Sequence, residues 1–192
     1  GEHSITPPLV SATARKYSNL SVLQIDAHAD MNTPATSLYV EPVRKTIRVK
    51  ATPTRAFEVF TAAMGRWWPP SHSTSRTGSP IADVVIEPRA GGRWFERGAD
   101  GTECDWGRVL VWSPPTRLVL RWQLDANWEF DPDLLTEVEL RFEARGDGET
   151  EVSLEHRGLE CYGDASATVR AAVDAPNGWG GLLEGYARAL AS

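Results

Sequence analysis

Several features that are common in proteins are scarce in this chain of 192 residues, and each scarcity excludes a class of protein. Two cysteines, Cys104 and Cys161, are too few for a disulfide framework, which predicts a reducing, cytoplasmic location. No apolar run approaches the roughly 20 residues of a membrane span, and no basic segment precedes an apolar one as in a signal peptide. The formal net charge of −6 and the pI of about 5.3 argue against nucleic acid as a partner.

The rest of the composition is that of an ordinary globular protein. Hydrophobic residues make up 41% and charged residues 24% of the chain, and its length suits one domain with a sizeable core. The unusual residue is tryptophan, which occurs eight times. Indole rings either fill a core or line a small-molecule pocket, so the placement of the tryptophans bears directly on function.

Residues 1–30 differ in character from the rest of the chain. They contain no tryptophan but two of the four histidines. Residues 20–25 have the pattern of a short buried strand, and Asp26, His28 and Asp30 come after it at alternate positions, as potential metal ligands. Residues 31–42 begin with one of only two methionines and are polar and proline-containing, which predicts a linker or a native N-terminus there.

Two motifs of this head, Gly-Glu-His-Ser-Ile-Thr and Asp-Ala-His-Ala-Asp, closely resemble metal-binding motifs of the ureohydrolases, the agmatinase and arginase family. The resemblance implies that His3, Asp26, His28 and Asp30 correspond to ligands of a two-manganese centre that activates water. The family's later Ser-Phe-Asp-x-Asp type motif is missing from residues 31–192. We therefore interpret residues 1–30 as a ureohydrolase-like fragment left by a fusion or by cloning, with vestigial metal positions. A manganese-dependent ureohydrolase is the least favoured function, and no cofactor is expected.

From residue 43 onward, the hydrophobic pattern predicts one strand, two short helices, six further strands and a terminal helix. The first strand covers residues 43–50, and Thr52 and Pro53 are typical of a helix start. The later strands are expected at residues 83–87, 94–97, 103–112, 117–124, 135–144 and 150–156. Apolar residues at helical spacing between Trp179 and Leu190 predict a helix that covers one face of the sheet. The fold class is therefore α+β, with a curved antiparallel sheet wrapped around a long C-terminal helix.

Residues 43–190 resemble the START-like, or SRPBCC, superfamily, and most closely its branch named for activators of the heat-shock protein 90 ATPase. The resemblance rests on the Val-x-Ala-x-Pro-x-x-Ala-Phe opening, on Glu-Pro-Arg-x-Gly-Gly-Arg-Trp and on Gly178-Trp179 before the last helix. It also rests on the segment at residues 107–118. It implies the helix-grip fold for residues 43–192, with an apolar cavity between the sheet and the long helix.

Aromatic residues in the elements around that cavity are the candidates for ligand binding, although a core function would place them similarly. The predicted set is Trp67, Trp68, Trp94, Trp106, Trp112, Trp122, Phe142, His156, Trp179 and Tyr186. Glu96 and Arg108 share strand faces with tryptophans and either anchor a ligand or reach water. His156 serves either as an acid–base group or as a hydrogen-bonded structural histidine, whereas His72 is expected to be solvated.

Binding of a small apolar or aromatic molecule is the function that this pattern favours. No complete catalytic motif occurs, so no catalytic residue is assigned. Two alternatives remain: an enzyme of the polyketide cyclase or dehydratase type, and a co-chaperone that stimulates the heat-shock protein 90 ATPase. A homodimer is also expected, without any sequence feature that fixes the oligomeric state.

Overall fold

The computed structural model describes residues 39–192, and every structural statement concerns this part of the chain. Positions His3, Asp26, His28 and Asp30, and the expected fragment and linker boundaries, lie outside or at the edge of the described residues. They therefore remain sequence-based predictions.

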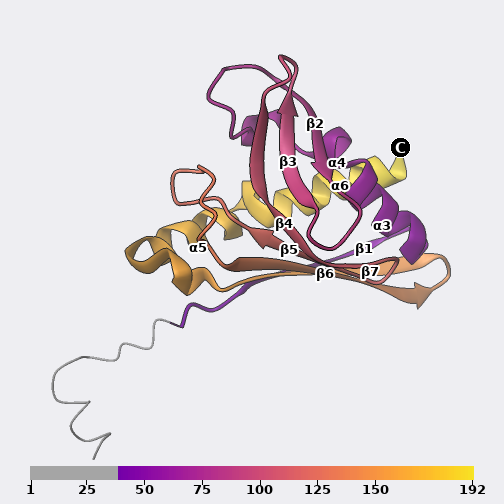
Figure 1. Ribbon diagram of the computed structural model, residues 1–192. Helices are drawn as coiled ribbons and strands as arrows, with labels where there is room; N and C mark the ends of the chain where they lie inside the picture. Colours follow the sequence, from indigo (N-terminus) through magenta and orange to yellow (C-terminus); the bar gives the residue numbers. More distant parts are fainter. Residues whose placement is uncertain (1–38) are drawn as a thin grey trace, which may run out of the picture. The chain divides into compact units, whose positions relative to one another are not determined.

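One antiparallel sheet of seven strands forms the framework of the described chain (Figure 1). Its spatial order is β1-β7-β6-β5-β4-β3-β2, so the last six strands form a meander and β1 pairs with β7. The strands are β1 (Val43–Val49), β2 (Ile81–Ile86), β3 (Arg93–Gly98), β4 (Glu103–Ser113), β5 (Arg117–Trp122), β6 (Thr136–Gly146) and β7 (Glu149–Arg157).

The helices lie between β1 and β2 and after β7. Helices α3 (Pro53–Ala62) and α4 (Met64–Trp67) precede a short 3₁₀ turn, Pro70–His72. A second 3₁₀ segment, Leu159–Ala165, leads into α5 (Ser166–Asp174), then a π turn (Pro176–Gly180) and α6 (Gly181–Ala191). Figure 1 shows α6 lying within the curl of the sheet, as expected for a helix-grip fold. The predicted fold class is confirmed, and the cap at Thr52 is as expected, because its hydroxyl accepts a hydrogen bond from the Arg55 amide (3.3 Å).

Alternation along the central strands separates a covered face from a wet one, although Val119 and Glu139 on the wet face are themselves buried. Leu118, Leu140 and Leu154 are cross-strand neighbours on β5, β6 and β7, and all three are buried beneath the helices. The opposite face carries ion pairs centred on Glu139, whose carboxylate contacts Arg117, Arg141 and Arg157. Burial opposes ionisation of Glu139, but these guanidinium groups lower its pKa to about 2. In residues 39–192, no helix is long and apolar enough to cross a membrane.

Candidate functional site

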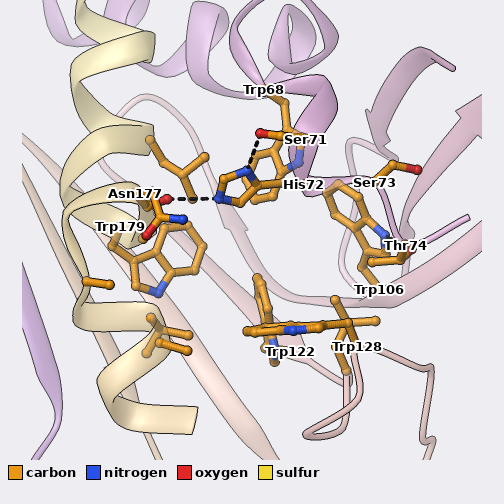
Figure 2. Close-up of a pocket in the computed structure, with 16 residues that line it drawn as sticks. Trp68, Ser71, His72, Ser73, Thr74, Trp106, Trp122, Trp128, Asn177 and Trp179 are labelled. Atoms are coloured by element: carbon orange, nitrogen blue, oxygen red, sulfur yellow. Dashed lines mark hydrogen bonds between the residues drawn. The ribbon is translucent and has the colours of Figure 1, made fainter. Parts of the chain in front are cut away.

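A pocket of about 300 Å³ opens between the covered face of the sheet, the 3₁₀ turn after α4 and the chain that joins α5 to α6 (Figure 2). Its wall is mostly aromatic and aliphatic, with a few hydroxyl groups and one imidazole. The lining residues are Trp68, Ser71, His72, Ser73, Thr74, Trp106, Trp122, Leu124, Trp128, Ala172, Val173, Ala175, Asn177, Gly178, Trp179 and Leu182.

Five indole rings contact one another in a closed circuit, and all of them except Trp94 line this pocket. Their centroids follow one another at 4.8 Å (Trp68–Trp106), 5.6 Å (Trp106–Trp94), 5.5 Å (Trp94–Trp122), 5.5 Å (Trp122–Trp179) and 6.3 Å (Trp179–Trp68). Most of the pairs meet edge to face, a geometry that contributes roughly 0.5–1.5 kcal/mol per pair beyond burial. The wall is therefore built from rings that hold one another in place.

A β-bulge places Trp106 on the inner face of the sheet. Trp94 pairs with Gly107 and Phe95 with Asp105, so β4 has one extra residue, Trp106, between these pairs. Gly107 faces Trp122 across the strands, and a Cβ at this position would collide with the Arg121 carbonyl oxygen. The close approach of the two strands therefore requires glycine there.

A buried hydrogen-bond chain fixes the Trp122–Trp179 side of the wall. The Trp179 indole N–H donates to Nδ1 of His156 (3.1 Å), and Nε2 of His156 contacts the Thr136 hydroxyl (3.3 Å). That hydroxyl donates to the Trp122 carbonyl oxygen (2.8 Å), so it accepts from Nε2–H of His156. Burial lowers the pKa of His156 to about 3, and the imidazole is therefore neutral and held in one tautomer.

A buried carboxylate fixes the opposite wall. Glu96 on β3 is fully buried and accepts hydrogen bonds from the Ser73 hydroxyl (2.7 Å) and from the amides of Thr74 (2.9 Å) and Ser75 (3.0 Å). The Thr74 hydroxyl also donates to Glu96 (3.3 Å) and accepts from the Trp106 indole N–H (2.8 Å). Glu96 thus anchors the loop of residues 73–75. It neither enters the pocket nor reaches water, and these were the two positions that its place on the strand predicted.

His72 lies in the pocket wall, and its predicted full solvation is wrong. Its Nε2 is 2.8 Å from the Asn177 carbonyl oxygen, and its Nδ1 is 3.1 Å from the Ser71 hydroxyl oxygen. A carbonyl only accepts, so Nε2 carries the proton, and Nδ1 accepts from Ser71. Asn177 is 105 residues away along the chain, so no local pattern indicates this contact.

Two lining indoles have a donor without a partner. The N–H groups of Trp68 and Trp122 are buried, and neither has a hydrogen-bond acceptor among residues 39–192. A buried unpaired donor costs about 1–3 kcal/mol. Both indole nitrogens are inaccessible to solvent, so a molecule in the pocket does not reach them without a change in the wall.

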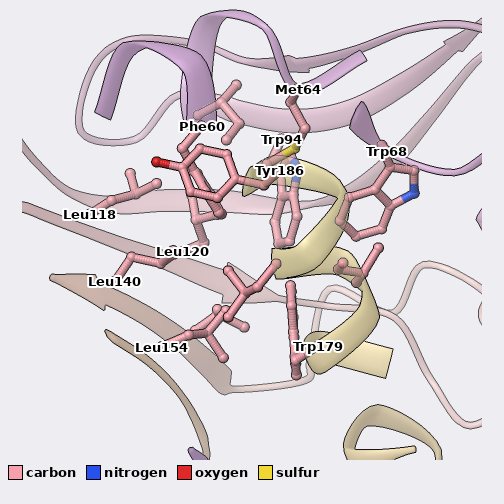
Figure 3. Packing of buried hydrophobic residues seen from close by; sticks show 14 of the residues in the cluster. Phe60, Met64, Trp68, Trp94, Leu118, Leu120, Leu140, Leu154, Trp179 and Tyr186 are labelled. Atoms are coloured by element: carbon pink, nitrogen blue, oxygen red, sulfur yellow. The ribbon is translucent and has the colours of Figure 1, made fainter. Parts of the chain in front are cut away.

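Four of the ten predicted binding residues line the pocket: Trp68, Trp106, Trp122 and Trp179. Trp94 and His156 pack directly behind this wall, against Trp122. The other four lie elsewhere on the covered face. Trp67, Phe142 and Tyr186 surround Phe60 in the core, part of which Figure 3 shows, and Trp112 packs against Phe57.

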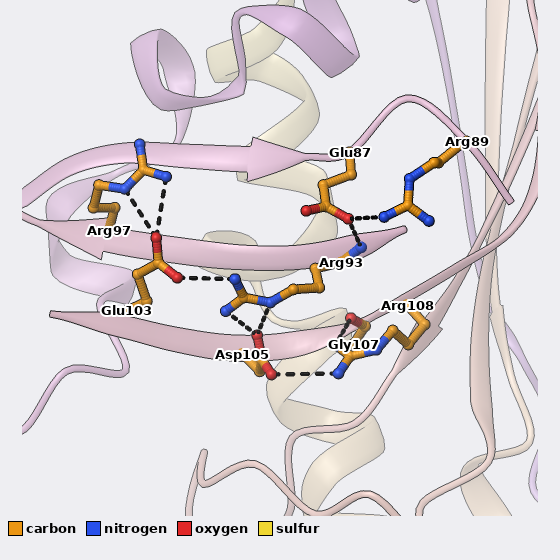
Figure 4. A network of polar contacts seen from close by, with 8 residues as sticks. All are labelled: Glu87, Arg89, Arg93, Arg97, Glu103, Asp105, Gly107 and Arg108. Atoms are coloured by element: carbon orange, nitrogen blue, oxygen red, sulfur yellow. Dashed lines mark hydrogen bonds and ion pairs between the residues drawn. The ribbon is translucent and has the colours of Figure 1, made fainter. Parts of the chain in front are cut away.

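Arg108 lies on the wet face of the sheet, opposite to the face that it was expected to share with Trp106 and Trp112. The bulge at Trp106 explains the difference, because one extra residue reverses the side-chain direction at Arg108. A second register shift, between Val109 and Val111, returns Trp112 to the covered face. Figure 4 shows Arg108 with Arg93 around Asp105, to which Arg93 donates at 2.7 Å and Arg108 at 3.5 Å. Arg108 therefore belongs to an ion-pair network outside the pocket.

Trp128 lines the pocket but was not in the predicted set. It is 39% exposed, has a positive φ of 62°, and lies 6.4 Å from Trp122 between ring centroids. It comes after β5 in a loop, where no hydrophobic periodicity indicates the direction of a side chain. Its exposure places it at the mouth of the pocket.

The comparison with family models decides the family. The model described as "Activator of Hsp90 ATPase homolog 1-like protein" matches residues 50–191. The chain belongs to this family. The Arginase family model matches residues 1–57, in agreement with the ureohydrolase resemblance of the head. No curated protein matches the sequence.

Solved structures similar to this AHSA1-family chain include two with substantial identity. The "anthrahydroquino-Gama-pyrone synthase Txn09 complexed with SUM" is 38% identical, with a TM-score of 0.57 over 79% of this chain and 98% of its own. The self-sacrificing resistance protein CalC from Micromonospora echinospora is 30% identical, with a TM-score of 0.58 over 78% and 93% of the two chains. The Aha1 dimer of Colwellia psychrerythraea, 17% identical with a TM-score of 0.52 over 79% and 96%, shares the fold alone.

Proposed function

We propose that the protein binds a flat, mostly apolar aromatic molecule in the tryptophan-lined pocket. The observation that carries the proposal is the wall itself: five tryptophans, Trp68, Trp106, Trp122, Trp128 and Trp179, border one cavity of about 300 Å³. That volume is at the lower end of the range for small-molecule sites, which suits a compact ligand of two or three fused rings. Stacked or edge-on indoles favour planar aromatic partners.

One further observation supports an oxygenated aromatic ligand. The 38% identical relative is named as a synthase of an anthrahydroquino-pyrone, which is a fused aromatic molecule with ring oxygens. The ligand class is therefore expected to be oxygenated polycyclic aromatics.

A pair of matched substitutions tests this proposal. Trp122→Leu removes a lining indole, whereas Trp112→Leu removes an indole from the same covered face outside the pocket. Titration with a dihydroxyanthraquinone, monitored by tryptophan fluorescence, is expected to show about tenfold weaker binding for Trp122→Leu and unchanged binding for Trp112→Leu. Equal effects of the two substitutions, or no binding to the unmodified protein by anthraquinones, flavonoids or aromatic acids, would contradict the proposal.

A second candidate function is an enzyme of the cyclase type. The specific observation in its favour is His72, an imidazole in the pocket wall with both ring nitrogens engaged. The name of the 38% identical relative supports the same reaction class. By contrast, the co-chaperone alternative rests on the family description alone, and the homodimer remains a prediction.

A further inference from the structure

We infer that His72 is an acid–base catalytic residue that moves a proton between two oxygens of a bound phenol–ketone. The inference rests on the proposed function, because the substrate must occupy the tryptophan pocket. It extends that function from binding to a reaction at a named atom, Nδ1 of His72.

The first argument is the tautomer. The Asn177 carbonyl accepts from Nε2–H at 2.8 Å, so a neutral imidazole keeps its free electron pair on Nδ1. Protonation of Nδ1 leaves the Nε2–H bond to Asn177 intact, so the ring keeps its position when it takes up a proton. This is the arrangement of a base oriented by a third group.

The second argument is access. Ser71, which donates to Nδ1 at 3.1 Å, is exposed, so its hydroxyl can rotate away and release the nitrogen. Ser71 and His72 both line the pocket, and Figure 2 shows the imidazole on the opposite side of the view from Trp122 and Trp128. His156, the other imidazole near the pocket, has both nitrogens committed inside the core and cannot serve this purpose.

The step conserves atoms and electrons. The phenol proton moves to Nδ1 of His72, and the phenol oxygen forms the new C–O bond to the ketone carbon. The electron pair of the C=O π bond moves to the ketone oxygen, which takes the proton back from His72. The product is a cyclic hemiketal with the composition of the reactant, and later loss of one water gives a pyrone; no oxidant or reductant is involved.

The probe for the test is ortho-hydroxydibenzoylmethane, which carries a phenol and a diketone and closes to flavone with loss of water. We expect the full chain to accelerate flavone formation, measured by absorbance. His72→Gln is expected to lower the turnover rate at least about a hundredfold while probe binding, measured by tryptophan fluorescence, changes less than threefold. Ser71→Ala should lower the rate far less, and Glu58→Gln, an exposed position on α3, should leave both quantities unchanged.

The outcomes separate the inference from the proposed function. Binding of the probe without acceleration, or an equal rate for His72→Gln, overturns the inference and leaves the binding function in place. Absence of binding by the unmodified protein overturns both. Circular dichroism of His72→Gln and of His72→Ala shows whether each variant is folded. A rate loss in both variants, with native spectra, supports the inference.

Discussion

At the scale of single residues, the tryptophans around the pocket differ in whether their indole N–H groups have a hydrogen-bond acceptor. The Trp179 and Trp106 indoles donate to protein acceptors, His156 and Thr74, whereas the Trp68 and Trp122 indoles have none among residues 39–192. The donors that have partners fix their rings. Trp68, Trp106, Trp122 and Trp179 both pack in the structure and border the pocket, and their use in recognition is what we propose.

The buried state of His156 predicts a pH dependence of stability. Its pKa is about 3 in the folded protein and about 6.5 when unfolded, so the unfolded chain binds more protons between these values. Stability is thus fully present above pH 6.5 and is lost as the pH falls toward 3. Urea unfolding at pH 7.5 and 5.5 should show a decrease of about 1 kcal/mol that His156→Gln removes. An equal decrease in His156→Gln would contradict this account.

At the scale of elements, alternation and helical spacing were enough to predict the strands, the capped start of α3 and the covering helix α6. These patterns gave wrong or no predictions where a strand or helix is irregular. The bulge at Trp106 reversed the direction of Arg108, and the π turn before α6 placed the Asn177 carbonyl beside His72. Contacts between segments far apart in sequence, such as Glu96 with the 73–75 loop, leave no local pattern and could not be predicted.

The loop at residues 73–75 should loosen when its anchor is weakened. Glu96→Gln replaces one acceptor oxygen by an NH₂ group that faces donors, so either the Thr74 amide, which donates to Oε2, or the Ser75 amide, which donates to Oε1, loses its partner. Hydrogen exchange of that amide is expected to accelerate at least about tenfold while the β5–β7 amides keep their protection. Glu58→Gln is the matched control on an exposed helix surface. Unchanged exchange at residues 74 and 75 would show that Glu96 does not hold the loop.

At the scale of the whole molecule, residues 39–192 contain the seven described strands, the helices that cover them and the pocket. The two family models overlap at residues 50–57, between the end of β1 and the middle of α3, since the Arginase model ends at residue 57 and the AHSA1-family model begins at residue 50. The motifs of residues 1–30 distinguish this head from the rest of the chain, because they resemble a different protein family. The division at residue 30 remains a prediction.

Removal of residues 1–30 should leave folding intact, because all seven strands in the described part of the chain lie beyond them. The two proteins are expected to melt within about 2 °C of each other by circular dichroism and to bind a dihydroxyanthraquinone equally. A decrease of many degrees on truncation would mean that the head contributes to the folded domain.

The most direct test of the central claim is a proton–nitrogen correlation spectrum of the eight indole N–H groups during titration with a dihydroxyanthraquinone. Binding in the pocket predicts shifts for the five lining indoles, Trp68, Trp106, Trp122, Trp128 and Trp179. The signals of Trp67 and Trp112, which lie outside the pocket wall, should stay in place. Shifts confined to Trp67 and Trp112, or no shift of the five lining indoles with any aromatic probe, would contradict the account.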